Sequence, residues 1–165
     1  MFSAKHLQVG ASGENIAKEF LKKKGFRIIT QNYKTRWGEI DVIAIRKDKT
    51  LVFVEVKTLA SYNKEIRQEN FAEDSLKPED NLTHSKLLKL KKSCEYFANR
   101  NPNLVNDQRG WQIDLITLII PKNETGELLP VPLEIARARS VSPSLMGLTN
   151  NEEDFVIKHY ENIHF

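Results

Sequence analysis

Three charged residues, Asp41, Glu55 and Lys57, interrupt two otherwise apolar segments within GEIDVIAIRKDKTLVFVEVKT (residues 38–58). An unpaired charge buried in a sheet costs several kcal/mol or more, and two neighbouring carboxylates raise each other's pKa unless a cation lies between them. Mg²⁺ suits such a position, because it binds one or two carboxylates together with waters and phosphate oxygens. The residue types therefore favour metal-assisted phosphodiester hydrolysis, with the Val56 carbonyl as a further ligand and Lys57 holding or activating the attacking water.

This chemistry requires the three side chains to share one face of the sheet. Glu55 and Lys57 do so, because they lie two positions apart on one strand. Asp41 joins them only if the hairpin register places it opposite Glu55 or Lys57, which the turn KDKT permits without proving. The plainer interpretation is that Glu55 and Lys57 form an ion pair on the surface. The acid fourteen residues before Glu55, on a consecutive apolar strand, favours the site.

The surrounding pattern predicts an α/β sandwich. Both segments of the central hairpin are apolar on both faces, so helices must cover each side of the sheet. We expect helices over residues 13–24 and 83–100, the first capped by Ser12 and ended by Gly25. The expected strands cover 26–33, 39–46, 51–58, 111–120 and 155–163.

Two segments do not fit this pattern. Residues 59–82 are polar and poorly periodic, which suggests a mobile segment with some helix around 64–73. Residues 121–154 contain four prolines and read as an irregular insertion, with one short helix at LEIARAR. We expect the whole chain, 1–165, to form one domain.

Composition favours a cytoplasmic protein that binds a polyanion. Residues 1–110 contain 21 Lys and Arg against 14 Asp and Glu, whereas residues 111–165 contain 4 against 8. The single cysteine, Cys94, excludes an internal disulfide and suits a reducing compartment. No apolar run approaches the roughly 18 residues of a membrane span, and the first residues lack the apolar core of a signal peptide. No membrane partner is therefore expected.

The motifs also resemble a known family. The order of an acidic residue on a first helix, Asp41, and then Glu55 with Lys57 is similar to the PD-(D/E)xK nuclease superfamily. More closely, GENIA (13–17), GEIDVIA (38–44), FVEVKT (53–58), QIDLIT (112–117) and the closing IKHYENIHF resemble the YraN-like family of small bacterial proteins. That family is regarded as endonuclease-like and similar to Holliday-junction resolvases. The resemblance implies a restriction-endonuclease-like three-layer sandwich with a mixed β-sheet flanked by helices.

The resemblance also assigns roles to individual residues. Asp41 and Glu55 look like ligands of Mg²⁺ or Mn²⁺, and Lys57 looks like the catalytic lysine. Glu14 matches an acidic residue that reaches the metal directly or through water, although at a helix N-terminus it would also stabilise the dipole. Lys86, Trp37 and Arg36 are candidates for nucleic-acid contacts, alongside ordinary surface or packing roles. His159 and Asn162 match the tail of the family, and we expect them, like Asp114, to be structural.

Two functions from different classes remain open. The first is a metal-dependent endonuclease acting on DNA, including branched or recombination intermediates, in which resolvase-like symmetry would favour a homodimer. The alternative is a nuclease fold that binds nucleic acid or recruits a partner without cleaving. A third, purely structural role for the Glu55–Lys57 pair is the plainest interpretation of the same residues.

Overall fold

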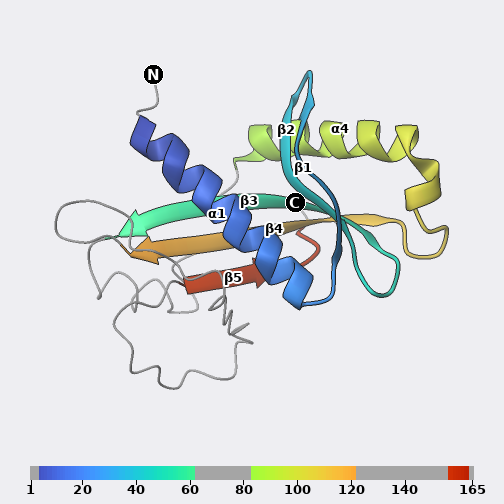
Figure 1. Ribbon diagram of the computed structural model, residues 1–165. Coiled ribbons are helices and arrows are strands. Elements are labelled where there is room, and N and C mark those ends of the chain that lie inside the picture. Colours follow the sequence, from blue (N-terminus) through green and yellow to red (C-terminus); the bar gives the residue numbers. More distant parts are fainter. Residues whose placement is uncertain (1–3, 62–82, 122–155, 164–165) are drawn as a thin grey trace.

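The computed structural model describes residues 4–61, 83–121 and 156–163. These residues form two α-helices, one short 3₁₀ helix and five strands (Figure 1). In chain order the elements are α1 (Ala4–Lys23), β1 (Arg27–Thr35), β2 (Gly38–Ile45), β3 (Leu51–Ser61), α4 (His84–Arg100), η1 (Pro102–Leu104), β4 (Trp111–Pro121) and β5 (Val156–Tyr160).

The five strands form one mixed sheet in the order β1-β2-β3-β4-β5. Neighbouring strands are antiparallel except for β3 and β4, which run parallel and are joined by the segment that contains α4. A parallel pair needs a crossover of this kind because its strands begin at the same end of the sheet. The predicted α/β fold with a mixed sheet flanked by helices is confirmed.

Strand alternation divides the core into two layers, one on each face of the sheet. Val52, Val54 and Val56 of β3 pack with Phe20 and Leu21 of α1. Leu51 and Phe53 of the same strand pack on the opposite face with α4, through its apolar stripe of Leu87, Leu90, Cys94, Phe97 and Ala98. Figure 1 shows α1 crossing the sheet, while the outer part of the β1–β2 hairpin turns away from β3 and runs past α4. The molecule is therefore a three-layer sandwich, consistent with a nuclease-like fold.

The structure corrects the predicted start of the first helix. Helix α1 begins at Ala4, nine residues before the predicted start at Gly13, so Ser12 is inside the helix and does not cap it. Its end agrees with the prediction, because Gly25 adopts φ +87° and its N–H donates to the Lys22 carbonyl. The Phe26 N–H donates to the Leu21 carbonyl, which completes a Schellman motif.

The ends of several strands also differ from prediction: β1 continues to Thr35 and β5 ends at Tyr160, where residues 33 and 163 were expected. Strand β3 continues through Ser61 rather than ending at residue 58, because residues 58–61 pair with residues 118–121 of β4. Helix α4 agrees with the prediction, and Thr83 caps it by accepting a hydrogen bond from the Lys86 N–H at 3.3 Å. The helix expected around 64–73 and the insertion from 122 onward, including LEIARAR, lie outside the described residues.

A buried polar cluster fixes β5 and the residues after it to β4. The Asp114 carboxylate is fully buried, and it accepts hydrogen bonds from Gln112 Nε2 at 2.7 Å, His159 Nε2 at 2.8 Å and the Asn162 N–H at 2.8 Å. Lys24 Nζ lies 2.9 Å from His159 Nδ1. Because an ammonium can only donate, Nδ1 of His159 accepts this hydrogen bond. Nε2 therefore carries the ring proton and donates a hydrogen bond to the Asp114 carboxylate. These contacts support the structural roles expected for Asp114, His159 and Asn162.

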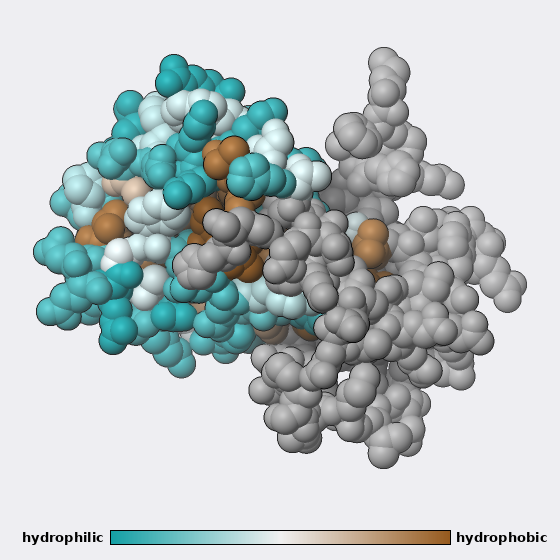
Figure 2. All heavy atoms as spheres, turned by 180° about the vertical axis from the view of Figure 1, so that it is seen from behind, coloured by the Kyte–Doolittle hydropathy of each residue, from teal (hydrophilic) through white to brown (hydrophobic). Residues whose placement is uncertain are grey.

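The described surface is largely hydrophilic. Its exposed large hydrophobic side chains are those of Leu59, Leu88 and Tyr96. Figure 2, which views the molecule from behind Figure 1, shows apolar side chains gathered near the middle of an otherwise hydrophilic described surface. In the part of the chain that the structure describes, no helix is both long and apolar enough to span a membrane.

The fit of α1 against β3 depends on the absence of a side chain at Gly13. A Cβ atom added at Gly13 would lie 1.8 Å from Thr58 Oγ1 and 2.9 Å from Thr58 Cβ. Contacts this short require the helix or the strand to move. The same close approach places the next residue, Glu14, over the sheet.

We predict that Gly13→Ala lowers the free energy of unfolding by about 1–3 kcal/mol, the usual cost of overpacking. Helix propensity alone would raise it by up to about 1 kcal/mol, so the sign separates the two effects in urea unfolding. Thr58→Ala in the same chain should recover part of the loss. Asn15→Ala, at an exposed position of α1, is the control and should be neutral or slightly stabilising. A stabilising Gly13→Ala would contradict the tight contact.

Candidate active site

Asp41 lies where strand β2 separates from β3. The last pairs of the ladder are Ile43 with Phe53 and Val42 with Val54, and continuing this register puts Asp41 opposite Glu55. The backbone ladder stops there, and the Val56 N–H instead donates to Asp41 Oδ2 at 2.6 Å. The carboxylate thus satisfies a backbone donor that β2 no longer reaches.

A sharp bend in the β1–β2 hairpin accounts for this separation. Asn32 lies opposite Asp41 in the register of β1 and β2, between the pairs Gln31–Val42 and Tyr33–Ile40. Its φ of +52° is in the left-handed region, which Asn tolerates better than most residues. Beyond this point the inward side chains Tyr33 and Ile40 pack on the α4 side, whereas Val42 packs on the α1 side.

Glu14 reaches the same place from α1, but not as the sequence suggested. Because the helix begins at Ala4, Glu14 is in its interior, and the alternative role in stabilising an N-terminal dipole is wrong. Burial raises the pKa of Glu14, and the carboxylates of Glu39 and Glu55 raise it further, while a hydrogen bond with the Asn32 side chain lowers it. Helix α1 thus brings the Glu14 carboxylate within electrostatic range of Asp41 and Glu55 on the hairpin strands.

Asn32 is a site residue that the sequence analysis missed. Its side chain holds Glu14, and its backbone conformation forms the bend at Asp41. The available signal was an Asn in the middle of a β-rich segment, where this residue is depleted. Glu39, which the sequence assigned to the strand entry, also lies within electrostatic range of Glu14.

The pKa of Asp41 is raised from 3.8 to about 7. Burial is the largest cause and the Glu55 carboxylate is the second, followed, among the effects that raise it, by Glu14. The hydrogen bond from Val56 and the charge of Lys57 lower the pKa, but they do not offset the burial. The other three predicted catalytic residues, Glu14, Glu55 and Lys57, therefore all act on Asp41 at this point of the sheet.

Glu55 and Lys57 are directly paired. Lys57 Nζ donates to Glu55 Oε1 at 2.5 Å, and both side chains are mostly buried, with exposed fractions of 26% for Lys57 and 14% for Glu55. The ion pair of the plainer interpretation is therefore present. It lies beside a buried carboxylate with a raised pKa, which a pair serving only the surface would not require.

The donor chemistry fits Mg²⁺ held by two carboxylates. In the described part of the chain, no three His, Cys, Asp or Glu side chains are gathered into a metal cluster. Mg²⁺ does not need one, because it commonly binds one or two carboxylates and completes its shell with waters and phosphate oxygens. The Val56 carbonyl is available on the same side, since the N–H and C=O of one strand residue point to the same neighbour, here towards Asp41.

The predicted nucleic-acid contacts lie outside this cluster. Arg36 and Trp37 form the turn between β1 and β2, and Trp37 is four residues from Asp41, at most about 13 Å of chain at 3.3 Å per residue. Lys86 is exposed in the first turn of α4. It is not among the groups that shift the pKa values of Asp41 and Glu14.

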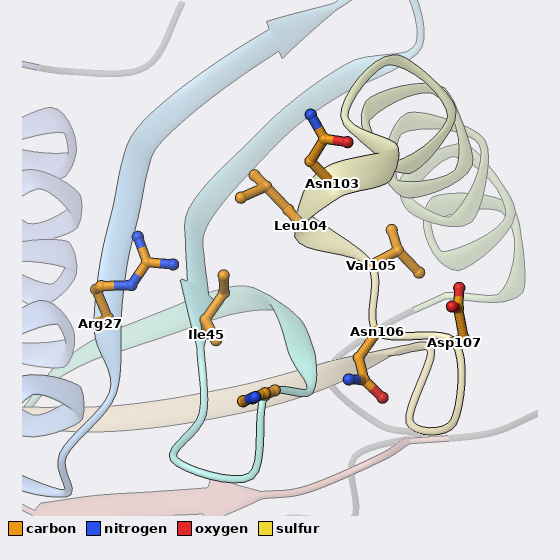
Figure 3. Close-up of a pocket in the computed structure, with 8 residues that line it drawn as sticks. Arg27, Ile45, Asn103, Leu104, Val105, Asn106 and Asp107 are labelled. Atoms are coloured by element: carbon orange, nitrogen blue, oxygen red, sulfur yellow. The ribbon is translucent and has the colours of Figure 1, made fainter.

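Two surface hollows of similar size lie away from the carboxylates. One, of about 380 Å³, is formed by Arg27 and Ile45 of the hairpin base and by the η1 segment, including Asn103, Leu104 and Val105 (Figure 3). The other, of about 390 Å³, lies between the β1–β2 turn and α4. Neither is lined by Asp41 or Glu55.

Residues 13–118 match the family described as Uncharacterised protein family UPF0102. A UPF0102 protein of Caldicellulosiruptor bescii is 38% identical over 68% of this chain and 83% of its own length. One of Campylobacter concisus is 37% identical over 73% of this chain and 88% of its own length. A solved structure, Pyrococcus furiosus SfsA in complex with Ca²⁺, has 17% identity and a TM-score of 0.29, over 76% of this chain and 62% of its own. The chain belongs to the UPF0102 family, the family of the YraN-like proteins that its motifs resemble.

Proposed function

We propose that this protein is a metal-dependent endonuclease that hydrolyses phosphodiester bonds of DNA. The observation that carries the proposal is the Asp41 carboxylate, which is largely but not fully buried at the separation of β2 and β3, beside Glu55 and Lys57. Burying a carboxylate next to a second one lowers the stability of the fold. A divalent cation would reverse this effect, which gives the arrangement a chemical purpose.

Each residue has a role in this proposal. Asp41, Glu55 and the Val56 carbonyl hold Mg²⁺ or Mn²⁺, which when bound polarises a phosphoryl oxygen and acidifies a water. Lys57 is held in place by Glu55, and its ammonium orients the attacking water and neutralises charge that develops on the phosphate. Glu14, steadied by Asn32, accepts a hydrogen bond from a water on the α1 side.

One observation favours the alternative, a nuclease fold that binds nucleic acid without cleaving it. Glu55 is already neutralised by Lys57 at 2.5 Å, and the described acids are not gathered into a three-residue cluster. A site that had lost its chemistry could keep this pair as a packing element. Such a site would bind no divalent ion, and this outcome separates the two functions.

The raised pKa of Asp41 predicts a specific dependence of stability on pH. The folded-state pKa of about 7 is above the unfolded value near 3.8, so the fold holds this proton more tightly. The contribution is therefore most favourable below pH 4 and is lost as the pH rises towards 7. In divalent-free buffer at pH 8, Asp41→Asn should be more stable than wild type by about 2–4 kcal/mol, at about 1.4 kcal/mol per pKa unit. In urea unfolding at pH 4 the difference should nearly vanish.

Asp48→Asn is the matched control for this measurement. Arg46 and Thr50 hold the pKa of Asp48 well below its usual range. The contribution of Asp48 to stability is present above the unfolded pKa and is lost on acidification, so this variant should be less stable than wild type at pH 8.

The proposed metal site predicts a response of stability to Mg²⁺. Millimolar Mg²⁺ should stabilise wild type at pH 8 by binding the folded state, and should leave Asp41→Asn unchanged. An equal response of both proteins to Mg²⁺ would contradict a metal site at Asp41.

Cleavage itself is tested on linear duplex, flapped, four-way and single-stranded DNA with Mg²⁺ or Mn²⁺. We expect wild type to cut at least one substrate, and Asp41→Asn and Lys57→Ala to lose about a hundredfold or more in rate. Arg109→Ala removes an exposed charge near the start of β4 and should cut like wild type. Retention of DNA by wild type without cleavage would support the binding-only alternative instead.

A further inference from the structure

An aromatic and basic notch lies between the turn of the β1–β2 hairpin and α4. It has a volume of about 390 Å³, and it combines two aromatic rings, two cations, one amide and one carboxylate. These are Trp37, Tyr96, Arg36, Lys92, Asn99 and Glu95. The hairpin contributes two of these side chains and one side of α4 contributes the other four. The notch therefore exists only in the folded arrangement.

The two rings of the notch contact each other and are both partly exposed. Trp37 and Tyr96 meet at 69° with their centroids 5.6 Å apart. The Arg36 guanidinium carbon lies 4.2 Å from the centre of the Trp37 ring, and that of Arg100 lies 5.5 Å from the centre of the Tyr96 ring. Tyr96 is 38% exposed, which is unusual for a large ring on this surface. Each ring is thus paired with a guanidinium group at the protein surface.

Hydrogen bonds hold the turn against α4. Thr35 Oγ1 lies 2.7 Å from Oγ of the buried Ser93, and it also accepts a hydrogen bond from the Trp37 N–H at 3.1 Å. The turn and the helix are therefore joined next to the notch. A rigid platform of this kind loses little conformational entropy when a flat ligand stacks on it.

We propose that this notch binds an unpaired nucleobase a few nucleotides from the scissile phosphate. Aromatic rings and guanidinium planes are the groups on which unstacked bases stack, and neighbouring cations attract the flanking phosphates. Arg36 and Lys92 outnumber Glu95, so the notch itself favours a polyanion. The bases of an intact duplex are stacked on one another and cannot enter.

The position of the notch gives the substrate class. Trp37, in the turn that precedes β2, is four residues from Asp41, which is at most about 13 Å of chain at 3.3 Å per residue. This length corresponds to about four nucleotides at the 3.4 Å rise of a duplex strand. This step rests on the proposed function, because it takes Asp41 as the place of cleavage. The substrate would then be DNA with unpaired nucleotides beside a duplex, such as a flap, rather than a fully paired four-way junction.

A second interpretation assigns the same rings to packing alone. The edge-to-face contact of Trp37 and Tyr96 would then only fix the hairpin to α4, at a contribution typical of aromatic pairs. Packing predicts that substitutions here change stability and leave nucleic-acid binding unaltered. The two interpretations differ in a measurement that does not involve cleavage.

The test uses the fluorescence of Trp37 in a Trp111→Phe background without divalent ion. Stacking of a base on the indole should quench its emission on titration with a single-stranded oligonucleotide or a flapped duplex. We expect at least tenfold weaker binding of a blunt duplex and of a four-way junction. Arg36→Ala and Tyr96→Ala should weaken flap binding by about five- to 150-fold, the range for loss of one stacking contact.

The controls keep folding and charge separate from recognition. Tyr96→Phe preserves the ring and should recover most of the affinity that Tyr96→Ala loses. Arg109→Ala removes an exposed arginine elsewhere and should also bind like it. Arg36 is exposed, so its variant should unfold at the same urea concentration as the parent. Titration with an RNA strand of the same sequence shows whether the notch distinguishes RNA from DNA. Tighter binding of the RNA would support base binding at the notch and count against DNA as the substrate.

The results distinguish this proposal from the proposed function. Binding of unpaired DNA at the notch, without cleavage in Mg²⁺, would support the notch and contradict the endonuclease. Cleavage of blunt duplex and flap at equal rates, unaffected by Arg36→Ala and Tyr96→Ala, would support the endonuclease and overturn the notch. The notch proposal would also be overturned if the parent bound flapped and blunt DNA with equal affinity while the Arg36→Ala and Tyr96→Ala variants remained folded.

Discussion

The hydrogen bond from the Val56 N–H to the Asp41 carboxylate is the contact on which the arrangement of the site depends. A central strand cannot leave its neighbour without exposing backbone donors and acceptors inside the sheet. Asp41 replaces the missing partner on β2 with a side chain, so β2 can turn towards α4 while β3 continues beside β4. Where the two strands separate, a carboxylate therefore lies beside backbone polar groups. An apolar residue at position 41 would leave the Val56 N–H without this acceptor.

The other members of the site reach this separation of β2 and β3 from different elements. Gly13 allows α1 to approach Thr58 closely enough for Glu14 to enter the field of Glu55. Asn32, in the left-handed region, bends the hairpin and holds Glu14 with its side chain. Neither residue is chemically reactive. Both residues position the carboxylates. The helix contact at Gly13 and the strand bend at Asn32 are needed together to bring Glu14 near Asp41 and Glu55.

Local pattern was enough to predict the strands and the shared face of Glu55 and Lys57, because side chains alternate strictly along a strand. It failed where long-range packing overrides local preference. Ser12 and the glycines at 10 and 13 are typical of a helix start, yet α1 begins at Ala4 and runs through them. From Gly13 onward the helix packs against the sheet, which local sequence does not reveal. Residues 59–61 look like a loop and become strand only through pairing with β4. The hydrogen bond between Asn32 and Glu14 joins residues eighteen positions apart, one on β1 and one on α1. No local sequence pattern predicts such a contact.

The charges of the site and of its surroundings suggest an order of binding. The carboxylates of Glu14, Asp41 and Glu55, with Glu39 nearby, outnumber the single ammonium of Lys57. The site would therefore repel a phosphate until a cation is bound. The basic side chains Arg36 and Lys92 lie apart from it, at the hairpin turn and on α4. A polyanion can therefore be held at a distance from the acids, where attraction does not depend on the metal. Under the proposed function, the cation would decide whether a bound strand reaches Lys57, which makes binding and cleavage separable properties of the same fold.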